Sequence, residues 1–275
     1  MNVENILEQY NLVSSELKFI TNSQLRLEAI KSFYIEDKMT MNEIYTTSGL
    51  SYSSTSTNIH QLERLGFLKS DKGIYSMKNL AKIKLEQLIK FSNSLSIINT
   101  FSDFLNEHKV DVIGGNYLNK IGDLSDSELV TSNLKDIYKP ERTVKKYVET
   151  ANSLKSIIPF IDCEFLKLIN YLLENEISMK LLVPKSISNT FIKSLNRKEM
   201  KKGMDQGKFE IRTIKDEIKI FMNVTEEILS LGLYKTDGTY DQNRIIISKD
   251  EKGLNWGKMI FNSFYNQSDR IFLNI

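Results

Sequence analysis

Residues 50–68 read LSYSSTSTNIHQLERLGFL, and this stretch decides the fold of the N-terminal part of the chain. It opens on a run of Ser and Thr residues and continues as an amphipathic helix. Ile59 and Leu62 recur at helical spacing, which turns them toward a core. Ser51 or Ser53 can cap the helix, since a hydroxyl satisfies a free N–H in the first turn. The run contains more hydroxyls than capping needs, so the others require a different explanation.

The segments on both sides of this helix complete a recognisable module. Residues 23–37 have apolar residues at helical spacing, and Thr40 with Glu43 predicts a capping box for a short helix that ends at Gly49. Residues 67–77 predict two short strands around a turn at Asp-Lys-Gly. A helix, a short helix, a tight turn, a longer helix and a hairpin, in this order, are typical of a winged helix-turn-helix.

The recognition helix of such a module enters the major groove of DNA with its first turns, where side chains must be short. Ser and Thr hydroxyls can donate to phosphate oxygens or meet base edges. We expect Gln61 to pair with adenine, Arg64 to reach phosphate, and Lys69 and Lys72 to touch the DNA backbone from the hairpin. The residues predicted to contact DNA are Tyr52, Ser53, Ser54, Ser56, Thr57, His60, Gln61, Arg64, Lys69 and Lys72.

Charge limits this interpretation. Residues 1–78 hold 8 Lys and Arg against 9 Asp and Glu, a net charge of −1. Residues 51–78 hold four basic residues against two acids, so the proposed DNA face is locally positive. Phosphate contacts dominate affinity, so we expect modest binding from one module and stronger binding from two. The alternatives are a solvated helix with a hydroxyl-rich start, or a winged helix that contacts protein.

The stretch at 50–68 resembles the recognition helix of ArsR-like archaeal winged-helix regulators, over about residues 15–80. The resemblance implies transcription regulation with double-stranded DNA as the partner. ArsR-type metal sensors use clustered Cys or His ligands. Cys163, His60 and His108 are the chain's complete set of these residues, so we expect no metal and no cofactor.

Composition sets the broad class. The chain has 275 residues, 41% of them hydrophobic, and a net charge of +2, which suits about two globular domains. No apolar run approaches the roughly 18 residues that span a bilayer. The first residues carry acids where a secretory signal needs positive charge, and the single cysteine fits a reducing compartment. We therefore expect a cytoplasmic protein without a membrane partner.

Residues 78–108 contain neither Pro nor Gly and predict one helix of about 45 Å, if it is unbroken. Two apolar stripes run along it, so we expect burial on two sides, one against the chain's own domains and one against a second copy. The alternative is a helix packed wholly within one subunit. The first stripe comprises Ala81, Leu85, Leu88, Leu95, Ile98 and Leu105; the second comprises Leu80, Ile83, Phe91, Phe101 and Phe104.

The pattern changes after residue 110. Short strands rich in Ile, Leu and Val alternate with amphipathic helices, which predicts an α/β domain with a mostly parallel sheet and a late antiparallel hairpin. The expected strands are 154–161, 177–184, 208–214, 218–224 and 228–238, and the expected helices are 140–153, 162–176, 185–204 and 251–269. The expected domains are a winged helix at 1–78, a connecting and dimerisation helix at 79–109, and an α/β effector-sensing domain at 110–275.

Four segments of this domain, IGDLSDSELV, DIYKPER, TEEILSLGLYKTDGTYDQNRIIIS and LNWG, resemble the methanogenesis regulatory protein middle domain, over about residues 115–270. That domain follows a winged helix in many archaeal transcriptional regulators. The resemblance implies a fold related to phospholipase D-like and sugar-sensing regulator domains, with a signal-receiving role. It defines no catalytic residues.

Catalytic motifs are missing from the sequence. Phospholipase D chemistry needs a His with Lys two residues on, and neither His60 nor His108 has one. There is no phosphate-binding loop with its Lys and no nucleophile elbow. We therefore expect no enzymatic activity.

The polar cluster in KTDGTYDQNR is the candidate effector site, formed by Asp237, Tyr240, Asp241 and Arg244. Ligands of open α/β sheets lie beyond the carboxyl ends of the strands, where such a loop can reach. Arg244 would bind a small polar or anionic metabolite, and Tyr240 would stack on it. The alternative is a hairpin turn with a local Asp–Arg pair.

These observations together indicate a homodimeric DNA-binding regulator that reads two half-sites through helix 52–65 and wing 68–77, under control of an unknown effector. The alternative is a ligand-binding or protein-interaction module.

Overall fold

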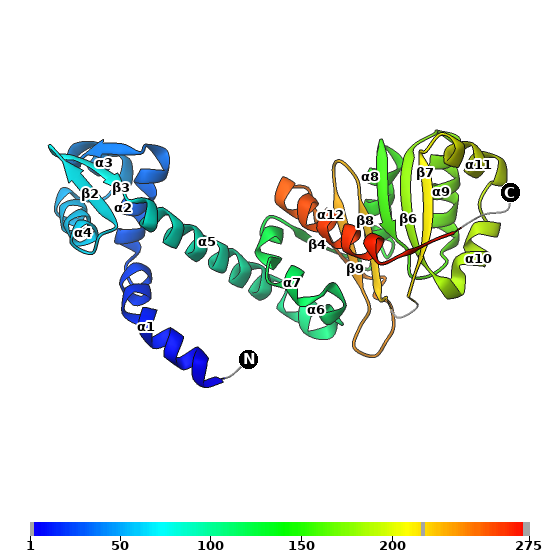
Figure 1. Ribbon diagram of the computed structural model, residues 1–275, viewed down its shortest axis with the longest axis horizontal. Coiled ribbons are helices and arrows are strands. Elements are labelled where there is room, and N and C mark those ends of the chain that lie inside the picture. Colours follow the sequence, from blue (N-terminus) through cyan, green and yellow to red (C-terminus); the bar gives the residue numbers. More distant parts are fainter. Residues whose placement is uncertain (1–2, 216–217, 272–275) are drawn as a thin grey trace. The chain divides into compact units, whose positions relative to one another are not determined.

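The structure, a computed structural model, describes residues 3–215 and 218–271. The chain divides into two compact units, Met1–Ile89 and Lys90–Ile275 (Figure 1). The division falls inside helix α5 (Asn79–Thr100), whereas the sequence placed boundaries near 78 and 109. Each unit has its own hydrophobic core and is described by itself.

The first unit consists of helices and a small antiparallel sheet with strand order β1-β3-β2. The short strand β1 was not expected from the sequence, and it pairs with β3 through Met39 opposite Tyr75. The elements are α1 (Val3–Thr21), α2 (Gln24–Ile35), β1 (Lys38–Thr40), α3 (Met41–Ser48), α4 (Tyr52–Arg64), β2 (Leu68–Asp71) and β3 (Ile74–Met77), followed by the first half of α5.

Local signals place these elements as the sequence predicted. Thr40 caps α3 and closes a capping box with Glu43. Gly49 follows α3 in the left-handed region at φ 69°, a conformation that glycine adopts without strain. Ser51, one of the two expected caps, accepts a hydrogen bond from the N–H of Ser54 at 3.2 Å. The short helix, turn and α4 therefore follow from capping chemistry alone.

The predicted helix over 78–108 is interrupted. α5 ends at Thr100, and a separate helix α6 (Ser102–Glu107) follows after Phe101, whose φ and ψ are −106° and 23°. The break turns Phe101 and Phe104 into the core of the second unit, where they are 4% and 1% exposed. The burial of two aromatic rings thus outweighs the local preference for one continuous helix.

The second unit is built on one eight-stranded sheet with order β11-β7-β6-β5-β8-β9-β10-β4. Its remaining elements are η1 (Val110–Ile113), α7 (Gly115–Leu118), η2 (Ile121–Leu124), β4 (Glu128–Thr131), α8 (Lys139–Glu149), β5 (Ser153–Ile157), α9 (Cys163–Glu174), β6 (Ser178–Pro184), α10 (Lys185–Lys193), α11 (Arg197–Asp205), β7 (Phe209–Ile214), β8 (Ile220–Val224), β9 (Leu229–Leu233), β10 (Arg244–Ser248), α12 (Glu251–Asn266) and β11 (Asp269–Arg270).

The expectation of a mostly parallel sheet is wrong. Among the described strands, β5, β6 and β7 pair in parallel, and every other neighbouring pair is antiparallel. Helices connect the parallel strands, whereas loops join β8, β9 and β10, and strands joined in this way pair antiparallel. The predicted helix 185–204 is also two helices, because Asn196 caps a new helix, α11.

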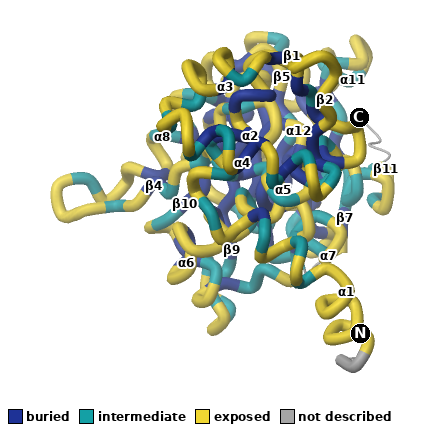
Figure 2. Tube along the Cα trace, turned by 90° about the vertical axis from the view of Figure 1, so that its left-hand side faces the viewer, coloured by how far each residue is buried: buried dark blue, intermediate teal, exposed yellow. Residues whose placement is uncertain are grey.

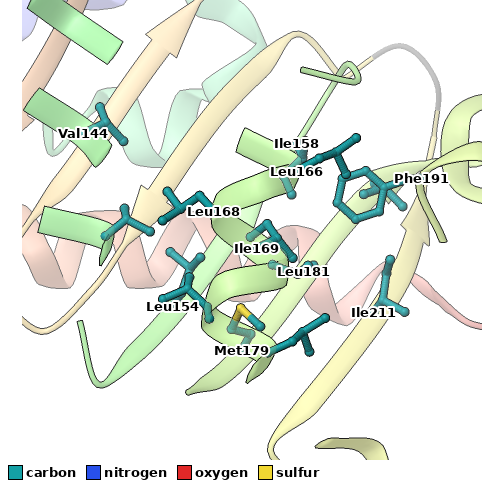
Figure 3. Close-up of a cluster of buried hydrophobic side chains, with 14 of the residues drawn as sticks. Val144, Leu154, Ile158, Leu166, Leu168, Ile169, Met179, Leu181, Phe191 and Ile211 are labelled. Carbon is teal, nitrogen blue, oxygen red and sulfur yellow. The ribbon is translucent and has the colours of Figure 1, made fainter. Parts of the chain in front are cut away.

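Side chains alternate between the two faces of the sheet and build two cores. On β6, Leu181 and Val183 face α8–α11, and Leu182 faces α12; on β10, Ile246 joins the α12 side. Figure 3 shows the first cluster, in which Leu168 and Ile169 of α9 lie against the strands. The sheet is therefore covered on both sides, and its exposed functional groups lie at strand ends and in loops.

The LNWG segment of α12 packs closely against the sheet. Trp256 is fully buried, and its indole N–H donates to the carbonyl of Tyr117 at 3.0 Å. A Cβ on Gly257 would lie 2.6 Å from Leu229 and 3.1 Å from Val224. The helix reaches this depth because residue 257 has no side chain.

Gly257→Ala should therefore destabilise the protein by about 1–3 kcal/mol through overpacking of a well-filled core. Gly115→Ala is the matched control, because a Cβ there meets no atom within 4 Å. Urea unfolding followed by circular dichroism measures both variants. Equal stability of the two would contradict the close approach of α12 to β9.

Candidate functional site

Helix α4 has one buried side and one free side. Thr55, Asn58, Ile59 and Leu62 face the core. Thr55 donates its hydroxyl to the carbonyl of Ser51, and Asn58 donates its amide to that of Ser54. The exposed residues on the opposite side are Tyr52, Ser53, Thr57, His60 and Arg64, while Ser54, Ser56 and Gln61 are half-buried. The structure thus brings most of the predicted DNA-contacting residues of α4 together on its free side.

Gln61 lies at the edge of this surface, and its side chain forms a hydrogen bond within the first unit. Its side-chain oxygen accepts a hydrogen bond from Arg26 of α2 at 2.9 Å. The Arg26 guanidinium also lies over the ring of Phe19, 3.7 Å from the centroid. Gln61 therefore connects two helices, and Arg26 already binds the carbonyl oxygen of the side chain that the sequence led us to expect at adenine.

The hairpin β2–β3 carries the two remaining predicted residues, Lys69 and Lys72, both exposed. Asp71 pairs with Ile74, so the connecting loop has two residues, Lys72 and Gly73. Their φ values of 50° and 80° are those of a type I′ turn, which suits the twist of a hairpin. The hairpin thus ends on a lysine at its tip.

The second unit contains a cleft of about 470 Å³ at the carboxyl end of β5. Its walls come from α8, the loop between β5 and α9, β8, and the segment between β9 and β10. Tyr240, Asp241 and Arg244 line it, whereas Asp237 does not. Asp237 instead accepts hydrogen bonds from the N–H and hydroxyl of Thr239, which shapes the exposed turn.

A chain of buried polar groups forms one end of the cleft. Asp241 accepts from Arg244 Nε at 2.8 Å and lies 3.0 Å from Nε2 of His108, and Arg244 also pairs with Glu107. The other ring nitrogen of His108 lies 2.5 Å from the carbonyl oxygen of Phe104. An acceptor faces each imidazole nitrogen, so both hydrogen bonds form only when both nitrogens carry a proton. His108 is thus a buried structural partner, more than the helix-end side chain expected from the sequence.

The environment tunes these groups. Burial by itself would raise the pKa of Asp241, but hydrogen bonds from Arg244 and the N–H of Asn243 outweigh it, so the pKa is lowered. Burial opposes the charge on Arg244, yet Glu107 and Asp241 raise its pKa. Burial raises the pKa of Tyr240 far above its usual range. The Asp–Arg pair is therefore ionised near neutral pH, and the phenol is neutral.

Gly232 fixes the position of Tyr240. A Cβ at 232 would lie 2.3 Å from the Tyr240 hydroxyl, so the phenol lies directly on the backbone of β9. The ring contacts Phe160 and Tyr234, with centroids 4.7 Å and 5.5 Å away. Tyr240 is thus a fixed wall of the cleft.

Sequence reasoning missed the far wall. Phe160, Phe165 and Phe221 supply aromatic rings, and Glu141, Asp162 and Glu164 supply carboxylates. The segment PFIDCEF, at the end of the predicted strand 154–161, was the available signal, because residues at a strand exit gather at ligand sites. Glu141 comes from another helix, and its signal was its place in the family-resembling segment DIYKPER.

Comparisons with known proteins give first the class of the second unit and then the family model that part of it matches. It is a mixed α/β domain, and residues 137–267 match the family model described as methanogenesis regulatory protein FilR1, middle domain. The methanogenesis regulatory protein FilR1 of Methanothrix harundinacea (strain 6Ac) is 26% identical over 199 residues, which cover 71% of this chain and 44% of that protein. The resemblance predicted from the sequence is thereby confirmed: residues 137–267 form a methanogenesis regulatory protein-type middle domain.

Solved structures give more distant matches. TrmBL2, described as an archaeal chromatin protein with a novel mode of DNA binding, is 15% identical with a TM-score of 0.42, covering 93% of this chain and 98% of that one. An IclR family transcriptional regulator from Brucella abortus is 13% identical with a TM-score of 0.25, covering 93% and 95%.

Asp241→Asn should lower stability by about 2–4 kcal/mol at pH 7, because it leaves Arg244 and His108 without their carboxylate. Since folding lowers the pKa of Asp241, its contribution is present above the usual aspartate pKa of about 3.9 and is lost as the pH falls through the lower folded value. The difference in stability between Asp241→Asn and wild type should therefore become smaller only in strong acid.

Melting temperatures at pH 7 and through the acid range test this. Asp237→Asn is the matched control, in the same loop but exposed and with no ion pair to any residue that the structure describes. A difference between wild type and Asp241→Asn that persists unchanged in acid would argue against an ionised Asp241.

Proposed function

We propose that this protein is a DNA-binding transcriptional regulator whose first unit is a winged helix-turn-helix. The observation that carries the proposal is the free side of α4, where Ser53, Thr57, His60 and Arg64 share a surface opposite the core. The order of helices and strands supports it, and so does the similarity of the second unit to a protein named as a regulator. In this proposal the protein binds DNA and does not catalyse a reaction. Its proposed location is the cytoplasm.

In the proposed complex, the first turns of α4 enter the major groove. Ser53 and Thr57 are short enough for the helix backbone to approach base edges, and Arg64, three turns along, reaches phosphate. Lys72 at the tip of the wing contacts the neighbouring backbone. Because Gln61 is held by Arg26, we assign the larger share of sequence discrimination to Thr57 and His60.

Arg64→Ala should weaken binding to all duplexes alike and reduce the dependence on salt concentration, because it removes one phosphate contact. Thr57→Val should instead change the preferred DNA sequence, since it replaces the hydroxyl by a methyl group and keeps the shape of the side chain. Lys31→Ala is the control, because Lys31 is an exposed lysine on α2 paired with Glu28. Selection from a random duplex pool, followed by fluorescence anisotropy at several salt concentrations, measures all three. No enrichment at low salt would refute DNA binding.

We also propose that the regulator is a homodimer. Leu80, Ile83, Phe91, Leu95 and Ile98 are exposed and share one face of α5, spaced for contact with another helix (the α5 stripe). Leu88, which the sequence placed on the same apolar stripe as Leu95, packs against the core of the first unit, whereas Leu95 is exposed.

Helix α1 adds a second unpartnered face. Ile6, Tyr10, Val13 and Leu17 follow one another at spacings of 4, 3 and 4 residues and are all exposed (Figure 2). This is the seam spacing of a coiled coil, which supports assembly of two copies.

Phe91→Asp should dissociate the dimer, because it would bury an unpaired carboxylate in the interface. Ile89→Asp is the matched control: Ile89 is an exposed residue on the opposite side of the same helix. Sedimentation velocity at micromolar concentration gives the mass of each. A monomeric wild type, or a monomer produced equally by both changes, would contradict the α5 stripe as the interface.

The cleft of the second unit is the proposed effector site. An effector acts only if it favours one arrangement of the DNA-reading units over another. Coupling of this kind is typically about 1–3 kcal/mol, or roughly 5- to 150-fold in DNA affinity.

A further inference from the structure

The cleft has an aromatic wall. Phe160 lies 5.7 Å from Phe221 and 4.7 Å from Tyr240, measured between ring centroids, and Phe221 lies 5.1 Å from Phe165. Rings tilted or edge-on to one another leave faces that carry negative partial charge. Such faces attract cations, most strongly where water is excluded.

The rim of the cleft is acidic. Glu141 projects from α8, and Asp162 and Glu164 lie at the start of α9. Glu164 is paired with Lys167, but Glu141 has no ion pair among the described residues. Burial, followed by the charges of Asp162 and Glu164, raises the pKa of Glu141, while Lys145 opposes the rise. The positive charge near Glu141 is therefore too small to balance the negative charge of its carboxylate.

Two of the groups that could bind an anion are occupied, and the third, Lys145, lines the cleft on the same helix as Glu141 and has no ion pair among the described residues. Arg244 is neutralised by Asp241 and Glu107. The N-terminus of α9, which favours negative charge, is capped by Asp162, which accepts from the N–H of Phe165 at 2.7 Å. The charged lining amounts to four carboxylates, Glu141, Asp162, Glu164 and Asp241, against two cations, Lys145 and Arg244. The small polar or anionic metabolite expected from the sequence would therefore meet an Arg244 whose charge is already balanced.

We propose that the cleft binds a small organic cation, an ammonium group on an apolar body. The ammonium lies against the rings of Phe160 and Tyr240 and is balanced by Glu141, and the apolar part fills the remaining space. A volume of about 470 Å³ suits a small metabolite. This inference rests on the proposed function only in treating the ligand as the effector; the charge preference stands on the cleft itself.

Three probes of nearly the same shape test the charge preference on the full chain. Choline carries the positive charge, 3,3-dimethylbutan-1-ol is its neutral isostere, and 3,3-dimethylbutanoate is a comparable anion. Saturation-transfer NMR and calorimetric titration measure their binding. We expect choline to bind at least about tenfold more tightly than the alcohol, and the anion more weakly than both. Equal binding, a preference for the anion, or binding of none of the three would overturn the proposal.

Variants separate charge from shape. Glu141→Gln should weaken choline about tenfold and leave the neutral alcohol unchanged, because it removes charge without changing volume. Glu149→Gln is the matched control, an exposed glutamate on the same helix outside the cleft. Phe160→Leu should weaken choline more than the alcohol, since it keeps an apolar surface and removes a ring face. A Glu141→Gln protein that binds choline like wild type would also overturn the proposal.

DNA binding of the same samples distinguishes the two hypotheses. DNA binding without choline binding would overturn the cation site and leave the regulator intact. Choline binding without DNA binding would support the cation site and count against the proposed function.

Discussion

The second unit depends on one buried carboxylate. Asp241 is 2% exposed and binds two side chains, Arg244 at the start of β10 and His108 from more than a hundred residues earlier. Removing water from a carboxylate is costly unless several hydrogen bonds replace the hydration. Three donors do so here, including the N–H of Asn243. The end of α6 is thereby fixed to the segment that enters β10.

This attachment has consequences for the cleft and for signalling. It neutralises Arg244, so the character of the cleft is set by the aromatic wall and by Glu141. Glu107, at the end of α6, is the other partner of Arg244, and α6 follows directly on α5. A ligand that moves Tyr240 or Asp241 would therefore act on the α5–α6 segment, the one proposed to form the dimer. Such a route is a contiguous set of contacts.

In the first unit, core packing determines which side chains are exposed on α4. Because Thr55, Asn58, Ile59 and Leu62 are buried, the opposite side of the helix carries Ser53, Thr57, His60 and Arg64. The hydroxyl run at the start of the helix therefore has two roles. Ser51 and Thr55 build the helix and its core, Ser53 and Ser54 lie within hydrogen-bond distance of the Ser51 hydroxyl, and Ser53 and Thr57 are exposed to a partner.

The sequence by itself determined the local elements and much of the candidate surface. Capping at Thr40 and Ser51, the turn at Gly49 and the hairpin around Lys72 depend on neighbours within a few residues, so the pattern was sufficient. The similarity to the middle domain was likewise readable from its motifs, because motif order is a property of the chain.

Only the tertiary structure decided the features that depend on residues far apart. The break after Thr100, the largely antiparallel sheet, the Gln61–Arg26 bond and the Glu107–Arg244 pair each require knowing which distant groups are nearby. Local propensity favoured one long helix, and burial of Phe101 overrode it. The sequence allowed a local Asp–Arg pair at 241 and 244, but it gave no sign of the contacts with Glu107 and His108. The periodicity of apolar residues shows which side of a helix or strand is buried, but it does not show which other residues that side contacts. The charge of the cleft depends on those contacts.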